Sequence, residues 1–164
     1  KTYVTRGSNY HVSVDGISIE ELFGEKVGAE KIDGDFVVPE LFLTVEGVRF
    51  NFAHHISGSL SGWIYRHTPS SKEAMLVKLN EHEKHPVDIV VRSHVHYFSG
   101  VFGPSYMSIT TPCWQLQNWF AMRRTSGGSI PHIGAVRFIC NDGNYSLEKK
   151  IFHMKAWKPP LVIA

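Results

Sequence analysis

The sequence predicts a mixed fold, α/β (α+β), in which a strand–helix–strand unit is followed by antiparallel β-structure. Two β-rich runs at 48–53 and 88–92 flank the best helical segment of the chain, and this order is typical of a βαβ unit with parallel strands. The tail contains three more β-rich runs, YMSITT, GAVRFIC and YSLEKKIFHM, and NDGN at 141–144 is a turn-forming sequence between the last two. We therefore expect one α/β domain that ends in an antiparallel hairpin.

Short elements are expected before the βαβ helix, each followed by turn-forming residues. The first of them is a strand that no other element precedes. It suggests that an N-terminal part is missing or is supplied by another chain. The expected elements are a strand at Thr2 to Thr5, a helix at 18–23 closed by Gly24, and strands at 41–46 and 48–53 that form a hairpin about Glu46 and Gly47.

The segment SSKEAMLVKLNEHEKH predicts a helix over 70–84. Ser70 is the expected N-cap, and Glu73 stands three residues later as the partner of a capping box. Apolar residues recur in this segment at a spacing that places them on one buried face. These residues are Met75, Leu76 and Leu79.

The composition is that of an ordinary globular domain of 164 residues, with 43% hydrophobic and 20% charged residues. Seventeen basic and fifteen acidic residues give a net charge of +2. This charge is too small to indicate the basic surface that binds nucleic acid. No apolar run is long enough to span a membrane, and the start lacks the pattern of a signal peptide. The two cysteines, Cys113 and Cys140, are interpreted as reduced and structural. We expect a cytoplasmic protein with no membrane partner.

Histidines follow two of the predicted strands. His54 ends the strand before the βαβ helix, and His94 and His96 follow the strand after it, in the run VDIVVRSHVHYF. The carboxyl ends of neighbouring parallel strands meet at one edge of a sheet, so these imidazoles can converge on one point. In extended chain, His94 and His96 would lie on the same side. Neutral imidazole binds zinc, iron and manganese. His55 is the weaker alternative to His54, because alternation points it away.

A second polar segment, RGSNYHV, places Gly7, Asn9 and His11 in a glycine turn after the first strand. The amide oxygen of asparagine can bind a metal, and histidine can act as a general acid or base. The same residues are also common in turns for backbone reasons alone, and for this segment by itself that interpretation is favoured.

Taken in chain order, these segments resemble the second half of the calcineurin-like metallophosphoesterase family, of which a phage or prophage type is one candidate. YVTRGSNYH looks like the family's GNH-type motif, VRFNFAHH like its single histidine after a strand, and VVRSHVHYF like its GHxH-type motif. The resemblance covers about residues 1 to 100 in motif terms.

The resemblance implies the C-terminal half of a β-sandwich of two mixed sheets flanked by helices, within a single domain at 1–164. It implies a centre of two divalent metal ions, manganese, zinc, iron or nickel, that hydrolyses phosphomono- or phosphodiesters. The residues matched to ligand positions are His54, His94 and Asn9 for one metal and His96 for the other. His11 matches the residue that protonates the leaving oxygen or stabilises the transition state. Arg92 stands next to the H-x-H motif and could reach a phosphate, although an arginine at a strand end is more often an ion-pair partner at the surface.

The sequence also departs from the family pattern. The order Gly7-Ser8-Asn9-Tyr10-His11 is longer than GNH, so either Ser8 or Asn9 is the expected ligand. No strand ends in the D-x-H motif, and DGDF at 33–36 carries the letters G-D out of order, as a polar turn. We therefore expect the acidic half of the site to be absent, cleaved or present as another chain. The chain alone should then bind metal poorly and be close to inactive.

Two other classes of protein fit part of the pattern. One is a non-catalytic metal-binding β-protein, such as a cupin, but cupins need an acid after H-x-H that YFSGVFG lacks, and they lack the helix at 70–84. The other is a degenerate phosphoesterase that serves as a scaffold. The substrate stays open among phosphate esters, with nucleotide and nucleic acid included. Trp114 or Trp119 could stack on a base, but burial in the core is the favoured interpretation.

Overall fold

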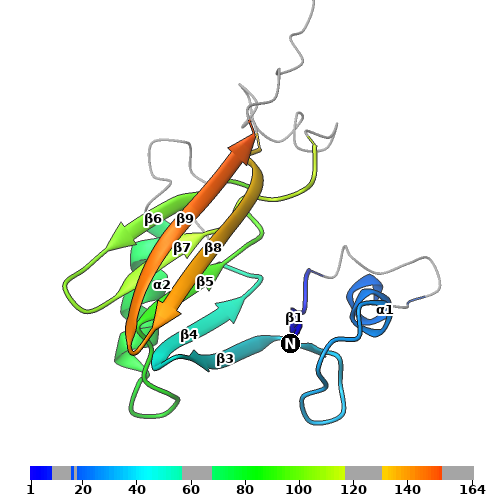
Figure 1. The fold of residues 1–164 in the computed structure, drawn as a ribbon, viewed down its shortest axis with the longest axis horizontal. Helices are drawn as coiled ribbons and strands as arrows, with labels where there is room; N and C mark the ends of the chain where they lie inside the picture. Colours follow the sequence, from blue (N-terminus) through cyan, green and yellow to red (C-terminus); the bar gives the residue numbers. More distant parts are fainter. Residues whose placement is uncertain (9–15, 17, 57–67, 117–130, 153–164) are drawn as a thin grey trace, which may run out of the picture.

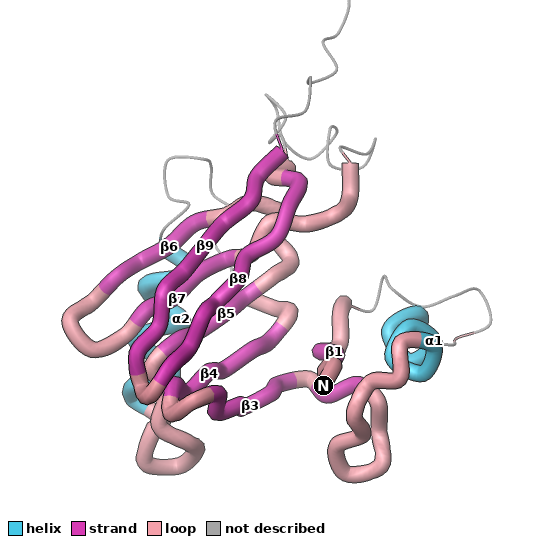
Figure 2. Tube along the Cα trace, in the orientation of Figure 1, coloured by secondary structure: helices cyan, strands magenta, loops and turns pink. Residues whose placement is uncertain are grey.

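The computed structural model describes residues 1–8, 16, 18–56, 68–116 and 131–152. Its main body is a five-stranded mixed sheet in the order β3-β4-β5-β7-β6, with a two-stranded hairpin, β8–β9, over one face and helix α2 over the other (Figures 1 and 2). Helix α1 and the small parallel sheet β1–β2 lie beside β3 (Figure 1). The elements are β1 (Val4–Thr5), α1 (Ile19–Lys26), β2 (Val37–Val38), β3 (Glu40–Val45), β4 (Val48–Ala53), α2 (Thr68–Leu79), β5 (Ile89–Arg92), β6 (Ser99–Phe102), β7 (Met107–Thr110), β8 (Ile133–Asn141) and β9 (Asn144–Phe152).

The mixed α+β class expected from the sequence is confirmed. Strands β4 and β5 pair in parallel on either side of the helical segment, with Phe50 opposite Ile89, and β5 continues in parallel with β7. The two edge strands are antiparallel to their neighbours. Strand β6 was not expected, because SGVF carries a glycine and no alternation of polar and apolar residues.

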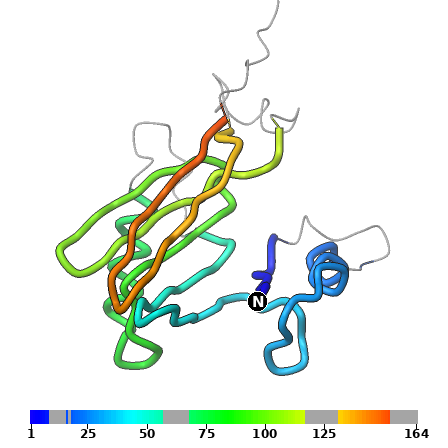
Figure 3. The backbone as a smooth tube through the Cα atoms, in the orientation of Figure 1, coloured from blue at the N-terminus to red at the C-terminus, as the bar shows by residue number. Residues whose placement is uncertain are grey.

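Both predicted hairpin turns are confirmed. Glu46 and Gly47 have φ angles of 47° and 79°, and Asp142 and Gly143 have φ angles of 45° and 74°. Two central residues with positive φ are the hallmark of the turn that matches strand twist in a two-residue hairpin. The turns also touch, because the N–H of Gly143 donates to the carbonyl of Glu46 at 2.7 Å. The backbone trace shows how this contact lays the C-terminal hairpin across the sheet (Figure 3).

The face of the sheet under the hairpin is apolar. The residues buried there are Val48, Phe50, Ile89, Val91, Met107 and Ile109. Hairpin side chains, Phe138 and Leu147 among them, pack against this cluster, and the rings of Phe50 and Phe138 meet edge to face at 5.1 Å. The hairpin is therefore held to the sheet by hydrophobic burial.

The sequence-based description of the second helix was wrong in two respects. Helix α2 begins at Thr68, so Ser70 lies inside it and is fully buried instead of capping it. The stripe expected to be buried faces solvent, with side chains 40% to 69% exposed at Met75, Leu76 and Leu79. The helix instead buries Pro69, Ser70 and Ala74. The reason lies in the sheet, because its face towards α2 carries polar side chains that small residues can approach closely.

The N-terminal elements differ from expectation in their bounds. The first strand is limited to Val4–Thr5, and helix α1 runs past the predicted end to Lys26. Ser18 caps this helix by accepting a hydrogen bond from the N–H of Glu21. Gly24 does not close the helix but lies inside it, buried against Phe36, where a Cβ would come within 2.9 Å of the Phe36 side chain. None of the described helices is long and apolar enough to cross a membrane.

Candidate metal-binding site

The structure brings His54 and His94 together at the carboxyl ends of β4 and β5. His54 Nε2 lies 3.0 Å from His94 Nδ1, and the N–H of Ser93 donates to the carbonyl of His54. The parallel pairing of β4 with β5 positions the two residues, since Ala53 is opposite Arg92 at the end of the ladder. The half-buried His54 and the exposed His94 thus face each other at the edge of the sheet.

His55 also belongs to this group. Its ring centroid lies 5.2 Å from that of His54 and 5.3 Å from that of His94. Alternation was expected to point it away, but β4 ends at Ala53, so the two-residue period no longer applies at 54 and 55. The structure therefore leaves the choice between His54 and His55 as a metal ligand open, with His54 Nε2 at 3.0 Å from His94 Nδ1.

The backbone of the H-x-H segment is not extended. His94 and His96 have φ angles of 68° and 58°, and the N–H of Val95 donates to the carbonyl of Ser93 at 2.8 Å. A three-residue turn about a residue with positive φ is rare and strained. The prediction that His94 and His96 lie on one side of an extended chain was therefore wrong, because β5 ends at Arg92 and a tight turn follows.

A further histidine, His132, supports this segment and was not identified from the sequence. The backbone N–H of His132 donates to the carbonyl of His96 at 2.8 Å. The ring Nδ1 of His132 accepts a hydrogen bond from the backbone N–H of Phe98 at 3.0 Å. An accepting Nδ1 is unprotonated, so the proton of the neutral ring is on Nε2. The only signal in the sequence was a histidine directly before the strand that begins at Ile133.

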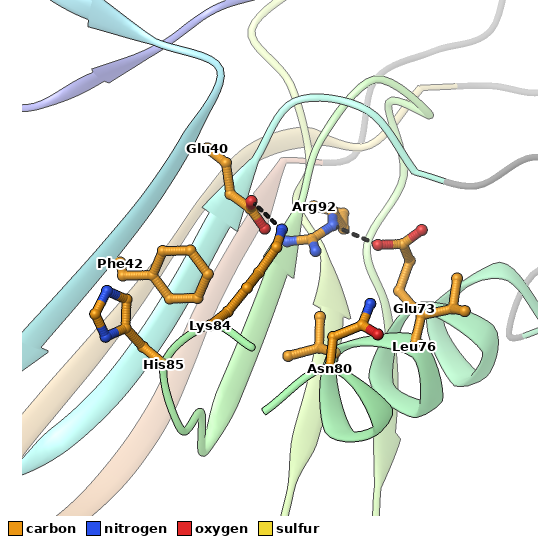
Figure 4. Close-up of a pocket in the computed structure, with 9 residues that line it drawn as sticks. Glu40, Phe42, Glu73, Leu76, Asn80, Lys84, His85 and Arg92 are labelled. Atoms are coloured by element: carbon orange, nitrogen blue, oxygen red, sulfur yellow. Dashed lines mark hydrogen bonds and ion pairs between the residues drawn. The ribbon is translucent and has the colours of Figure 1, made fainter. Parts of the chain in front are cut away.

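Arg92 lies on the face of the sheet that α2 covers. Arg92 is 3% exposed. Its Nε donates to Glu73 Oε2 at 2.8 Å (Figure 4), and its Nη1 donates to the carbonyl of Asn51. The side chain faces α2 and forms a buried ion pair with Glu73. This position does not support the predicted contact of Arg92 with a phosphate, since a buried and paired guanidinium has little access to a ligand at the histidine edge.

The ion pair lines a small polar cavity of about 130 Å³ between α2 and the sheet (Figure 4). Lys84 and Asn51 donate to the Glu40 carboxylate at 2.6 Å and 2.9 Å. Burial raises the pKa of Glu40, but these hydrogen bonds outweigh it and hold the pKa below its usual value. Two acids and two bases balance in charge here, and the Arg92–Glu73 pair links the sheet to the helix.

The separation of the two histidine nitrogens suits a shared metal ion, but the described residues do not complete the set of ligands. Two nitrogens bound to one ion at about 2.1 Å, at about a right angle to each other, lie about 3.0 Å apart, which is the separation of His54 Nε2 and His94 Nδ1. Across the described ranges, however, no group of three or more His, Cys, Asp or Glu side chains is arranged to hold an ion. Asn9 and His11 lie outside the described residues, so their positions do not enter this test.

Two other expectations concern residues away from this edge. The DGDF segment is a tight turn, with Asp33 and Gly34 at positive φ and reciprocal backbone hydrogen bonds between Ile32 and Asp35. Cys113 and Cys140 are free thiols, and burial raises the pKa of both. A raised pKa disfavours the nucleophilic thiolate, in keeping with a structural interpretation of the cysteines.

No protein-family model and no curated protein matches this sequence. Among solved structures, the chain is similar to Vps29 from Chaetomium thermophilum, at 10% identity and a TM-score of 0.44, over 92% of this chain and 97% of that one. It is similar to a single mutant of Vps29 from Entamoeba histolytica, at 11% identity and a TM-score of 0.43, over 76% of this chain and 65% of that one. Wild-type Vps29 from the same organism, complexed with Zn²⁺, matches at 13% identity and a TM-score of 0.40, over 74% and 68%. At these values the similarities assign no function to this chain.

Proposed function

We propose that this chain supplies the histidine part of a divalent-metal centre that hydrolyses phosphate esters, with manganese, zinc, iron or nickel as the metal. The observation that carries the proposal is the approach of His54 Nε2 to His94 Nδ1 at 3.0 Å, from the ends of two parallel strands. The strained turn at His94 supports it, because strain of this kind persists where the surrounding structure fixes a functional side chain.

The two histidines have defined tasks in this proposal. His54 would bind through Nε2 and His94 through Nδ1, which requires the proton of each neutral ring to be on the other nitrogen. The hydrogen bond from Ser93 N–H to the His54 carbonyl and the turn at Ser93–Val95 hold both rings at the sheet edge. When bound, divalent ions of this kind polarise a phosphoryl oxygen and lower the pKa of bound water towards neutrality.

The rest of the site is proposed from the motif resemblance. Asn9 would complete the first metal position, His96 would contribute to the second, and His11 would protonate the leaving oxygen. Since the described residues hold no complete ligand set, the acidic ligands are proposed to come from an additional N-terminal segment or a second chain. The substrate class is a phosphate mono- or diester.

Two observations favour a different function. Within the described parts of the chain, no group of three or more His, Cys, Asp or Glu side chains is arranged to hold a metal ion, and Arg92, the cation expected near a phosphate, is buried in an ion pair. Both facts suit a degenerate member of the fold that binds metal weakly or serves as a scaffold. Removal of His94 separates the two functions, because a scaffold would retain its partner.

Metal binding is the direct test. Titration of the chain with Co²⁺, followed by its visible absorption, should show nitrogen coordination that His94→Ala weakens at least about tenfold. His82→Ala, at an exposed histidine in the segment after α2, should leave the titration unchanged. Equal cobalt affinity in the wild type and His94→Ala would contradict the proposed ligand pair.

Hydrolysis assays test whether the acidic ligands of the site come from outside this chain. The chain alone should show almost no turnover of p-nitrophenyl phosphate or bis-p-nitrophenyl phosphate with added Mn²⁺ or Zn²⁺, because the acidic ligands are supplied from elsewhere. Robust turnover by the chain alone would show that its own residues complete the centre.

A further inference from the structure

Trp114 and Phe152 form an exposed aromatic pair. Their side chains are 71% and 45% exposed, and their ring centroids lie 6.0 Å apart at an angle of 45°. Trp114 follows β7 and Phe152 ends β9, so the two segments meet at the same end of the molecule (Figure 1). The core position favoured for Trp114 from the sequence is therefore wrong, and Trp119 lies outside the described residues.

A short hydrogen-bonded ladder joins this pair to the H-x-H segment. The N–H of Cys113 donates to the carbonyl of His132 at 2.9 Å, and the N–H of His132 donates to the carbonyl of His96 at 2.8 Å. Two steps of this kind span about 10 Å, twice the spacing of paired strands. Trp114, the next residue after Cys113, is thus within about the length of a nucleotide of the segment that carries His94 and His96.

The chemistry of the pair suits a nucleobase. Exposed indole and phenyl faces stack with any nucleobase, because every base has a π-face. Lys150 adds a cation, with its Nζ 5.7 Å from the centroid of the Phe152 ring. The neighbouring ammonium group favours a ligand whose overall charge is negative.

We propose that Trp114 and Phe152 form a stacking surface for the nucleobase of a nucleotide whose phosphate lies at the His54–His94 pair. The phosphate part of this inference rests on the proposed function, whereas the stacking part stands on the aromatic pair itself. The ligand is identified by its chemistry, a nucleobase with an attached phosphate, which either a free nucleotide or the end of a polynucleotide provides.

Binding of three related probes tests the proposal, with affinities measured by NMR titration. Trp114→Ala should weaken AMP and adenosine at least about fivefold, and it should leave ribose 5-phosphate unchanged because that probe has no base. Trp114→Phe should bind close to the wild type, since it retains a π-face. Phe102→Ala, at a 65% exposed phenylalanine on β6, is the matched control and should change nothing.

The design separates failure of the stacking surface from failure of the proposed function. Equal AMP affinity in the wild type and Trp114→Ala, or no AMP binding up to millimolar concentration, would overturn the stacking surface. His94→Ala should weaken the binding of AMP and ribose 5-phosphate but not that of adenosine. If it weakens the binding of none of them, the phosphate is not held at the histidine pair, and the effect of Trp114→Ala on adenosine binding still decides the stacking.

A further probe identifies the source of the nucleobase. A short oligothymidylate that binds more tightly than AMP, with the same dependence on Trp114, would identify the source as a polynucleotide end, whereas equal or weaker binding would identify a free nucleotide.

Discussion

The two faces of the five-stranded sheet are both buried, but by different chemistry. Under the β8–β9 hairpin the strands present Phe50, Ile89 and Ile109, and the contact is apolar. Under α2 the alternate residues of the same strands present Asn51, Arg92, Ser108 and Thr110, all at most 3% exposed. Burial alone therefore does not decide which residues a strand carries, because each face follows the element that covers it.

The polar face depends on pairing of its buried groups. Arg92 and Glu73 satisfy each other there, with side chains 4% and 12% exposed. Among the described residues, three buried polar atoms on this side lack a hydrogen-bond partner, namely Asn51 Oδ1, Ser70 Oγ and Ser108 Oγ. A buried hydroxyl without a partner opposes folding. The hairpin face should thus contribute more to stability than the helix face.

Truncation of the apolar face should have the largest effect. Ile109 is fully buried on β7, so Ile109→Ala removes buried methyl groups and leaves a cavity. We expect the free energy of unfolding to fall by about 2–5 kcal/mol, measured by urea denaturation. A loss well below about 1 kcal/mol would show that the hairpin is not packed against the sheet as described.

The neighbouring residue should respond in the opposite direction. Ser108 is also 0% exposed, but it faces α2 and its hydroxyl has no partner among the described residues. Ser108→Ala should raise the free energy of unfolding by about 1 kcal/mol, because it removes the cost of an unsatisfied buried group. Thr111→Ser, which keeps the hydroxyl that Ser93 contacts at 3.0 Å, is a conservative control on the same chain segment. Destabilisation by Ser108→Ala would show that this hydroxyl does have a partner in solution.

The difference between the two faces of the sheet also explains what could be predicted from the sequence. The parallel pairing of β4 with β5 and both hairpin turns followed from local patterns, strand–helix–strand order and glycine in turns. The face of α2 could not be predicted in the same way, because Met75, Leu76 and Leu79 have the spacing of a buried stripe, and only the polar character of the sheet beneath the helix places them outside. Local propensity cannot report what covers the opposite side of an element.

The candidate site shows the same division. Strand ends predicted that His54 and His94 meet, since that depends only on strand order. The turn at His94 depends on backbone geometry that no local pattern in the sequence signals. The support from His132 comes from a segment far along the chain, and its one signal is a histidine directly before a strand. Arg92 likewise depends on a distant residue, because its partner Glu73 is 19 residues away.

The smallest expected effect comes from a further ion pair on the polar side, Arg49 with Asp88, at the opposite end of β5 from Arg92. Asp88 accepts from Arg49 Nε at 2.9 Å and Nη2 at 2.5 Å, and from the backbone N–H of Arg49 at 2.9 Å. These hydrogen bonds from Arg49 hold the pKa of Asp88 below its usual value, against the opposing effect of burial. The pair is partly exposed, with side chains 43% and 29% accessible, so solvent screening limits its contribution.

The sign of the pH dependence follows from this lowered pKa. The folded state holds fewer protons on Asp88 than the unfolded state, so the stabilisation is fully present above the unfolded pKa of about 3.9 and is lost as the pH falls through the folded value. Asp88→Asn should therefore lower the free energy of unfolding by about 1 kcal/mol at pH 7, and the difference from wild type should shrink below about pH 4. Urea denaturation of both proteins across this range is the measurement, with Glu83→Gln, at an exposed position after α2, as the control. A difference that stays constant from pH 7 to pH 3 would mean that the Asp88 charge is not what stabilises this end of the sheet, and that shape or hydrogen bonding to a neutral group suffices there.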